Sequence, residues 1–456
     1  SFTVTGTGTA GSGGTIQNIT NRGASFISAA NTSLTNINFT NTATAAGTPC
    51  GSAAVVGANT GCNASINLQS VTGVTLDRLN ITTSGQQGIN GIDVTNFTLS
   101  NSALSGLGNA PDEDGLHFHN MLGTNAITNT TIASSGDDNV NIQNLSATPS
   151  TITISGGSFN TGIQGSGLLF GIRNTANATI DISGVTIDNN FSGGIVADTF
   201  DTATTKIDIS GVTIRNNNDG IQISGHNGNV QFDIHDNSDA SPASGLGIYN
   251  NDFLAITILK SAFSTAGRLE GQITTTEITV PDQRPTDAIL VFAAGGGETR
   301  TAITNNPISY RGTQRPITIQ GGQDGAAIMD TIITGNTIDI QLDGTNNALG
   351  GILANVIIAT PGGNGSTLCA DIGGAGALAN TFTYSLGGGP LAAGEIFAYA
   401  NAMVDQSTSG YAGAANDNAA VITYLNGRNN EVSSSTATND NGLFSGGAAC
   451  AAPVIP

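Results

Sequence analysis

The chain repeats a pair of short segments in which apolar and polar residues alternate. Residues 178–190 read ATIDISGVTIDNN and residues 205–217 read TKIDISGVTIRNN, so that Ile180 falls on Ile207. Alternation with a period of two is typical of β-strands, because successive side chains point to opposite faces. A repeat this short, without a helix between its strands, is too small for a propeller blade and lacks a leucine-rich pattern. We therefore expect an all-β protein whose residues 1–365 form a parallel β-helix, or β-solenoid.

The same unit recurs with slightly different lengths. One repeat earlier, Ile152 and Ile154 fall on Ile180 and Ile182. GVTLDRLNIT also matches GIDVTNFTLS, with Val74 over Ile92, and ITNNPIS matches ITGNTID. Each repeat would wind once, so that inward Ile, Val, Leu and Phe side chains stack into one core. Length differences are absorbed at the corners, where Asn and Gly accept left-handed dihedral angles and Asn side chains can stack into ladders.

Composition excludes several classes of partner. The chain has 456 residues, of which 63 are Gly, and its formal net charge is −20. Its 12 Lys and Arg residues against 32 acidic residues leave no basic patch for phosphates, so we expect no nucleic-acid partner. No apolar run approaches the length of about 18 residues that a membrane span needs, so we expect none. Hydrophobic residues make up 38% of the chain, which is enough to build a core.

The four cysteines are Cys50, Cys62, Cys369 and Cys450. None forms a CxxC pair, and the histidines belong to other segments, which argues against a zinc site. An even count in an acidic, Lys-poor chain indicates two disulfides and an oxidising compartment. Of the three pairings that four cysteines allow, we expect the sequence-local one, Cys50–Cys62 and Cys369–Cys450. The first would staple a Gly-rich loop, and the second would tie the C-terminus back to the body.

One stretch, PDEDGLHFHN, concentrates acidic residues and two of the four histidines. DEDGLHF and GDDNVNI align one coil apart, and NNDGIQI has the same form. The pattern predicts that one aspartate of each segment occupies a corner before a strand: Asp114, Asp138 and Asp219. Leu116 and Phe118 would then point inward, whereas His117 and His119 would point outward on an exposed strand. We interpret the stretch as a corner followed by a strand.

Pectin-cleaving polygalacturonases are the enzymatic alternative. They are β-helices with Asn-Thr-Asp-Gly, Gly-Asp-Asp and Gly-His-Gly motifs on successive coils, and DEDG followed by Gly136-Asp137-Asp138 resembles the first two. In such an enzyme, paired carboxylates protonate the glycosidic oxygen and activate water. The catalytic candidates would be Asp114, Asp137, Asp138 and His117. The histidine motif is missing near residue 160, where the chain reads GGSFNTGIQG, and GHNG occurs only at 225–228. Cations that could line a polyuronate groove are scarce, so we expect no catalytic residues.

A wider resemblance covers nearly the whole chain. The segments that carry it include CNASINLQSVTGVTLDRLNI, GINGIDVTNFTLSNS, EDGLHF, DDNVNIQN and GYAGAANDNAAVITYLNGRN. In their shared order they resemble a right-handed β-helix module of large secreted or surface-anchored bacterial repeat proteins of the adhesin type. The resemblance implies an extracellular, non-catalytic role and agrees with two local disulfides. It implies no particular functional residues.

The two ends of the chain differ. NDNAAVITYLNGR predicts a helix with Asn416 or Asp417 as its cap and Gly427 as its stop, and residues 366–456 are expected to form the last coils and a disulfide-tied cap. The N-terminus has no such device, and its first coil would expose unpaired backbone groups. Its inward residues would form an assembly end: Phe2, Val4 and Ile16. We expect this end to be covered by another copy of the chain, stacked end to end, or by upstream coils of a longer chain.

Together these features predict a non-catalytic extracellular protein. It would act as a cell-surface adhesin or stalk, or as the subunit of a head-to-tail surface filament. A polysaccharide-active enzyme of the hydrolase or lyase type, or a glycan-binding module, is the alternative. The expected partners are further copies of the chain and surface glycans. We expect no cofactor, with a structural calcium ion as the secondary candidate.

Overall fold

The computed structural model divides into two compact units: unit 1 is Ser1–Ile207 with Val212–Asn218, and unit 2 is Asp208–Gly211 with Asp219–Pro456. Each unit is described by itself. The residues that the structure describes are 2–9, 11–45, 61–238, 246–281, 286–322, 325–341, 351–356, 366–385, 396–401, 405–409, 411–431, 436–440, 443–447 and 449–456.

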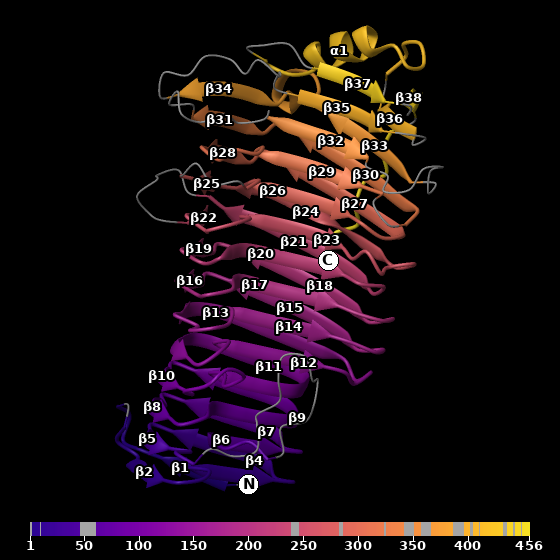
Figure 1. Ribbon diagram of the computed structural model, residues 1–456. Coiled ribbons are helices and arrows are strands. Elements are labelled where there is room, and N and C mark those ends of the chain that lie inside the picture. Colours follow the sequence, from indigo (N-terminus) through magenta and orange to yellow (C-terminus); the bar gives the residue numbers. More distant parts are fainter. Residues whose placement is uncertain are drawn as a thin grey trace. The chain divides into compact units, whose positions relative to one another are not determined.

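Unit 1 consists of three parallel sheets, 1A, 1B and 1C, to which each coil contributes in turn (Figure 1). Sheet 1A contains β3 (Ala24–Ile27), β6 (Ala64–Gln69), the first parts of β9 (Gln87–Ser100) and β11 (Leu116–Ser135), β12 (Val140–Asn144), β14 (Leu168–Ile172) and β17 (Gly193–Thr199). Sheet 1B contains β1 (Phe2–Thr5), β4 (Ala30–Thr35), β7 (Thr72–Asp77), later parts of β9 and β11, β13 (Ser150–Asn160) and β15 (Asn177–Ser183). Sheet 1C contains β2 (Thr15–Ile19), β5 (Asn38–Thr42), β8 (Asn80–Ser84), β10 (Ala103–Leu107), the last parts of β11 and β13, β16 (Thr186–Asp188) and β19 (Thr213–Arg215). The division between the units falls within β18 (Thr204–Ser210).

Unit 2 is built from three sheets of the same kind. Sheet 2A contains β20 (Asp219–Gly225), β23 (Ile256–Lys260), β26 (Ile289–Ala293), β29 (Ile317–Gly321), β32 (Ile352–Val356), β35 (Ile396–Asn401) and β37 (Thr436–Asp440). Sheet 2B contains β21 (Asn229–Asn237), β24 (Arg268–Thr276), β27 (Gly297–Thr304), β30 (Ala327–Thr334), β33 (Thr367–Ile372), β36 (Asp405–Ser409) and β38 (Leu443–Gly447). Sheet 2C contains β22 (Gly247–Tyr249), β25 (Ile278–Val280), β28 (Pro307–Tyr310), β31 (Thr337–Gln341) and β34 (Thr381–Ser385). A short 3₁₀ helix, η1 (Gly376–Leu378), and helix α1 (Asn418–Asn426) complete the described elements.

The fold is therefore the predicted all-β, right-handed parallel β-helix with a small helix-containing cap near the C-terminus. Its core consists of apolar residues that stack from coil to coil. Ile152 pairs with Ile180 in the predicted register, and both side chains are fully buried. Ile303 pairs with Ile333, again in the register that the repeats predicted. Each fully buried aliphatic side chain stabilises the fold by about 1.5–3 kcal/mol relative to its exposed state.

One predicted register is wrong. The match of GVTLDRLNIT with GIDVTNFTLS would place Val74 beside Ile92. Val74 instead pairs with Phe97, and Leu76 pairs with Leu99. Two alternating runs match each other at every even shift, so alternation alone does not fix their register. A corner between the strands interrupts the alternation, and the actual register therefore differs from the sequence match.

Asparagine side chains join successive corners of unit 2. The Oδ1 atom of Asn336 accepts hydrogen bonds from both the backbone N and the Nδ2 of Asn306, each at 3.0 Å. Asn380 accepts the same pair of bonds from Asn336, and Asn429 accepts them from Asn380. All four residues are buried. These residues form an asparagine ladder, as predicted for stacked corners, and it ends where Asn429 Nδ2 donates to the carbonyl oxygen of Leu425 in α1.

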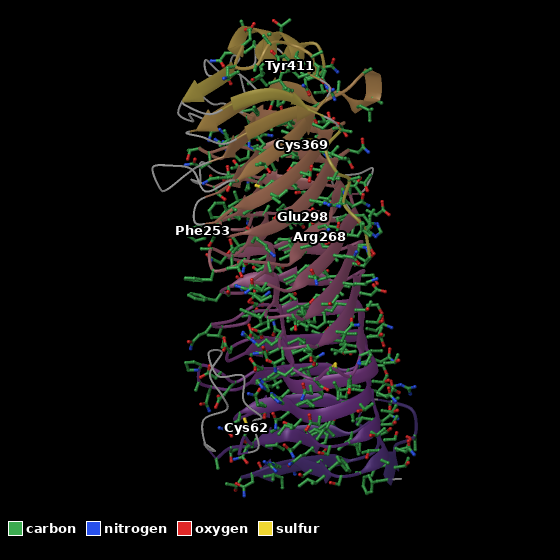
Figure 2. The ribbon with its side chains drawn as sticks, turned by 90° about the vertical axis from the view of Figure 1, so that its right-hand side faces the viewer. Cys62, Phe253, Arg268, Glu298, Cys369 and Tyr411 are labelled. Atoms are coloured by element: carbon green, nitrogen blue, oxygen red, sulfur yellow. A yellow bond between two sulfur atoms is a disulfide. The ribbon has the colours of Figure 1, made fainter. Side chains whose placement is uncertain are left out.

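Helix α1 closes one end of unit 2 (Figure 1). The predicted cap, Asp417, accepts a hydrogen bond from the backbone N of Ala420, and the helix stops at Gly427 as predicted. Val421 and Leu425 are buried beneath the helix. The predicted disulfide between Cys369, labelled in Figure 2, and Cys450 is present. Cys62 is also disulfide-bonded, but its predicted partner Cys50 lies outside the described residues.

Beyond Cys450 the tail runs back along the outer face of sheet 2B. The backbone N of Ala451 donates to Asp330 Oδ1 at 2.9 Å, and that of Val454 donates to Glu270 Oε2 at 3.0 Å. Asp330 pairs with Cys369 in the adjacent strand, and Glu270 lies two coils further along the same row. The tail therefore crosses several coils in the direction away from α1.

The first coil of unit 1 is paired on one side. Its strands β1, β2 and β3 pair with β4, β5 and β6, and no second partner occurs within the part of the chain that the structure describes. Phe2 is 49% exposed, and its ring lies 5.4 Å from that of Phe26. Val4 and Ile16 are partly exposed. These are the residues predicted to form the assembly end.

Candidate functional site

The acidic and histidine residues singled out in the sequence meet at one corner of sheet 1A. Asp114 precedes β11, whereas Asp137 and Asp138 precede β12, one coil later. One carboxylate oxygen from each of the three residues lies within 4.8 Å of the others. Asp114 and Asp138 are buried, and Asp137 is half-buried. The structure therefore brings together the three predicted acids.

Three buried side chains at this corner each accept a hydrogen bond from the backbone of the next coil. Gln87 Oε1 accepts from the backbone N of Asp114 at 2.6 Å. Asp114 Oδ1 accepts from the backbone N of Asp138 at 3.1 Å. Asp138 Oδ1 accepts from the backbone N of Ser166 at 2.6 Å. We call this series of Gln87, Asp114 and Asp138 the corner acceptor column. It satisfies buried N–H groups that would otherwise cost free energy.

The second oxygen of each buried carboxylate is also engaged. Asp114 Oδ2 lies 2.7 Å from His117 Nδ1, and Asp138 Oδ2 accepts from Asn141 Nδ2 at 3.2 Å. Both oxygens of each carboxylate thus have structural partners. A carboxylate held in this way is poorly placed to reach a glycosidic oxygen or a water molecule.

The histidines differ from the prediction. Leu116 and Phe118 are fully buried in the core, as predicted, and His117 pairs laterally with Asn141 on the other face. However, His117 is only 6% exposed, and His119 is half-buried, so the prediction of an exposed strand is wrong. His117 is covered because its ring turns toward the buried Asp114, a contact across the corner that the strand pattern does not describe.

Burial controls the protonation of this corner. Burial, followed by the charge of Asp137, raises the pKa of Asp114 well above its usual range. Burial, followed by the charge of Asp114, does the same to the pKa of Asp138. Burial also raises the pKa of Asp137 and lowers the pKa of His117 to about 4. His117 is therefore a neutral imidazole at neutral pH, which can donate its Nδ1 proton to Asp114.

Glu113 belongs to the same corner, although the sequence interpretation missed it. It is 6% exposed, and its Oε2 accepts from the backbone N atoms of Asn109 and Ala110 at 2.5 and 2.8 Å. Asp137 Oδ2 likewise accepts from the backbone N of Asp112 at 3.1 Å. An acid three or four residues after a Gly-Asn turn is the signal that could have identified Glu113 as a turn-closing residue.

The structure shows which residue stands at the position of the third polygalacturonase motif. Val140 pairs with Leu168, so the residue one coil after Asp138 is Ser166, within Gly165-Ser166-Gly167. The expectation of this position near residue 160 is corrected accordingly. A serine stands where those enzymes have a histidine. Calcium binds carboxylate oxygens of the kind that these three acids carry. Both oxygens of Asp114 and of Asp138, however, already have hydrogen-bond partners within the fold.

The corner acids of unit 2 have the same role. The predicted residue Asp219 accepts at Oδ1 from the backbone N of Leu254 at 3.1 Å. Asp287, which the sequence interpretation did not identify, accepts at Oδ1 from the backbone N of Arg315 and from Thr318 Oγ1. Burial raises the pKa of both carboxyl groups. An acid just before an alternating run is thus a recurrent device that joins one coil to the next.

A second titratable cluster lies on the outer face of unit 2. His235 contacts Asp208 Oδ1 through Nε2 at 3.3 Å and Asp236 Oδ2 through Nδ1 at 2.9 Å. Asp233 accepts from Gln272 Nε2 at 3.1 Å. Although burial lowers it, the pKa of His235 is raised overall because the three carboxylates favour the charged imidazolium. All four side chains lie at or near the surface and form an ordinary charged cluster.

The interior of unit 2 holds a lysine that the sequence interpretation also missed. Lys260 is the last residue of β23, and its exposure is 0%. Ile256, Ile258 and Lys260 occupy alternate positions of β23, and this alternation was the available signal, because it places Lys260 at the next inward position.

Comparisons with protein-family models, curated proteins and solved structures found no match to this chain. Among the described residues, no helix is long and apolar enough to cross a membrane.

Proposed function

We propose that this is a non-catalytic structural protein of the extracellular space, acting as a cell-surface adhesin or stalk or as the subunit of a head-to-tail filament. The corner acceptor column carries this proposal. The residues that most resemble catalytic acids are buried, and both oxygens of Asp114 and of Asp138 bind groups of the fold itself. Their chemistry is that of coil-to-coil attachment.

Two further observations support the proposal. The Cys369–Cys450 disulfide agrees with an oxidising compartment outside the cytosol. The first coil of unit 1 presents one unpaired edge on each of β1, β2 and β3 within the described residues, together with the partly exposed Phe2. Unpaired strand edges are templates for another chain or for further coils.

The assay that tests the proposal is release of reducing ends and of unsaturated products from pectin and related polysaccharides. We expect no release above a heat-denatured control. Asp137→Asn tests the half-buried acid, and Asp201→Asn, which changes an exposed corner acid of the same unit, is the matched control. Product release that Asp137→Asn abolishes and Asp201→Asn leaves intact would refute the structural proposal. If no product is released, electron micrographs of the native material would distinguish a filament from a single-chain stalk.

A glycan-active or glycan-binding protein is the second candidate, and one observation favours it. Phe191 is 71% exposed and Ile163 is 54% exposed on the corner next to Asp137. The backbone N of Phe191 donates to the carbonyl oxygen of Gly162, which packs against the backbone of Asp137. An exposed ring suits a sugar, because it can cover the apolar face of the sugar.

Glycan binding is tested with immobilised polysaccharides and two variants. If a surface glycan binds at this corner, Phe191→Ser should weaken retention at least ten-fold. Phe253→Ser, which removes an exposed ring in unit 2, should leave it unchanged. Equal retention of the wild type and both variants would exclude this corner as a glycan site.

A further inference from the structure

Among the residues that the structure describes, four polar atoms in the interior of unit 2 have no hydrogen-bond partner. They are Lys260 Nζ and the hydroxyl oxygens of Thr299, Thr301 and Thr331. Each of these residues is at most 1% exposed. Buried polar groups are nearly always hydrogen-bonded, so each unsatisfied atom calls for an explanation, of which an interior water or ion is the usual one.

Lys260 lies on β23 of sheet 2A, whereas Thr299 and Thr301 lie on β27 and Thr331 lies on β30 of sheet 2B. Lys260 ends β23 and pairs with Gly225 of β20 and Ala293 of β26, so that its lateral neighbours are small. Thr301 of β27 pairs with Thr331 of β30. The lysine leans toward the start of β27, since a Cβ atom added to Gly297 would lie 3.0 Å from Lys260 Cε. The same Cβ atom would lie 2.7 Å from the carbonyl oxygen of Gly267 and 2.8 Å from that of Ala266, and the φ of Gly297 is +99°, so this position requires glycine.

Thr299 is two residues beyond Gly297 on the same strand. Alternation therefore places both residues on the inward face, and Thr299 pairs with the fully buried Leu269. Lys260 Nζ and Thr299 Oγ1 thus belong to the same part of the interior, and neither has a partner.

No carboxylate among the described residues balances the lysine. The charged residues of the adjacent strands alternate with the inward positions and are engaged on the outer face. Glu270 accepts from the tail residue Val454, and Glu298 binds Arg268 at 2.5 Å and Arg300 at 2.6 Å. Figure 2 labels Arg268 and Glu298 side by side on this face. His226 follows Gly225 at the corner and is half-buried. Burial alone lowers the pKa of Lys260 to about 8.

An ammonium group buried without a partner is strongly unfavourable. Its three N–H groups can only donate hydrogen bonds, and a threonine hydroxyl can donate one as well. A group of donors around an uncompensated positive charge matches an anion, because water supplies an acceptor but no charge. The closed, fully buried position and the Gly and Ala neighbours restrict the anion to a small one.

We propose that the interior of unit 2 binds a small inorganic anion, of the size of chloride, against the Lys260 ammonium, with the Thr299 hydroxyl as a second donor. Because the interior is closed, the anion enters as the coils form, and its binding stabilises the folded unit. Without the anion the pKa of Lys260 is about 8, so above that pH the amine must first be protonated and the apparent affinity for the anion falls by about ten-fold per pH unit.

Equilibrium unfolding at constant ionic strength tests the proposal, with sodium chloride replaced stepwise by sodium methanesulfonate. At pH 7 the unfolding temperature of the wild type should rise by on the order of 3 °C for each ten-fold increase in chloride above its dissociation constant. At pH 10 the chloride dependence should disappear. A dependence of the same size at both pH values would overturn the proposal.

The chain offers a matched control because it contains only two lysines, Lys206 and Lys260. Lys260→Met should abolish the chloride dependence, whereas Lys206→Met, which removes the same charge from a half-buried position in unit 1, should retain it. Thr299→Val should weaken the dependence without abolishing it. If Lys260→Met failed to fold, Thr299→Val and the pH comparison would still decide the matter.

Crystals grown in bromide provide a direct measurement. An anomalous peak beside Lys260 Nζ is the expected result. A peak-free interior, or a wild type that shows no response to chloride at constant ionic strength, would mean that water or a neutral amine occupies this position, and the proposal would be wrong.

Discussion

The aspartates of the candidate site differ from ordinary surface carboxylates in what they bind. Asp114 and Asp138 each accept the backbone N–H of the residue one coil later, and Asp219 and Asp287 do the same in unit 2. Removing such an acceptor leaves a buried N–H group unsatisfied, which costs about 1–3 kcal/mol. At the residue scale, the corner acids therefore link successive coils through side-chain-to-backbone hydrogen bonds.

Replacing Asp114 tests this role. Asp114→Ala should lower the free energy of unfolding at pH 7 by about 1–3 kcal/mol, because the buried N–H of Asp138 loses its acceptor. Asp114→Asn keeps an acceptor oxygen and should cost about 1 kcal/mol or less. Denaturant titration of both variants measures the difference. Equal losses for Ala and Asn would show that the hydrogen bond to Asp138 contributes little.

The pH dependence at this corner has a definite sign. The pKa values of Asp114 and Asp138 are raised in the folded state, so the folded state binds more protons than the unfolded state above about pH 4. The contribution of these two carboxyl groups to the free energy of unfolding should therefore fall as the pH rises from about 4 through the folded-state values. Asp138→Asn, which cannot ionise, should flatten this decline. The lowered pKa of His117 makes the opposite contribution between about pH 4 and 6.5, so the decline is measured as the stability of the wild type minus that of Asp138→Asn. A difference that increases with pH over this interval would contradict the assignment.

The sequence predicted which face most residues of the site occupy but not how deeply they are buried. Alternation placed Leu116 and Phe118 in the core correctly. It could not show that the His117 ring turns toward Asp114, because alternation indicates which face a side chain occupies but not its exposed fraction on that face. Lys260 was missed for the opposite reason: its charge argued against the inward position that its place after Ile258 indicated.

At the scale of elements, the corners and the cap fix the positions of the strands. The asparagine ladder joins Asn306, Asn336, Asn380 and Asn429 and ends on the last turn of α1. The sequence predicted Asn-rich corners, the helix with its Asp417 cap and the Cys369–Cys450 disulfide. It could not fix every register, because an alternating run matches its neighbour at several shifts, as the wrong pairing of Val74 illustrates.

A break in the ladder should be costly. Asn336→Ala removes the acceptor of the Asn306 backbone N and one of the two acceptors of Asn306 Nδ2, which keeps only the carbonyl oxygen of Ile273, all in a buried corner. We expect a loss of about 2–4 kcal/mol in the free energy of unfolding of unit 2. Thr337→Ala, on the exposed side of the same corner, is the matched control and should cost less than about 0.5 kcal/mol. Similar losses in both variants would mean that the ladder does not hold the corners together.

The tail is the element that the disulfide should control. The bond closes a sequence separation of 81, for which the loop-closure model gives up to about 4.5 kcal/mol. Replacing Cys369 and Cys450 by Ser should release the amides of Ala451 and Val454 to rapid hydrogen exchange, while the amides of β24 stay protected. Non-reduced peptide mapping of the wild type should show the same link. Slow exchange at both tail residues in the double variant would mean that Asp330 and Glu270 hold the tail unaided.

At the scale of the whole molecule, assembly through the first coil stays a prediction. A contact between unlike ends is heterologous and yields a filament when its rotation does not close. If the chain stacks in this way, Phe2→Glu and Val4→Glu should each shift the size distribution toward the monomer. Ile27→Glu alters the exposed outer face of the same coil and should leave the distribution unchanged. A monodisperse wild-type monomer at high concentration, with residues 2–9 protected from exchange, would exclude the filament.

The asparagine ladder also affects the chemical stability of its Asn side chains toward deamidation. Deamidation requires the backbone nitrogen of the following residue to attack the side-chain carbonyl carbon, and it makes Asn a thermolabile residue. Asn306 is followed by Pro307, which has no N–H, whereas the nitrogen of Thr337, which follows Asn336, already donates to the Asn306 carbonyl oxygen at 3.0 Å. Each ladder amide is also fixed by its own hydrogen bonds. The asparagines that join the coils are therefore protected against the reaction that shortens the chemical lifetime of most Asn-rich chains.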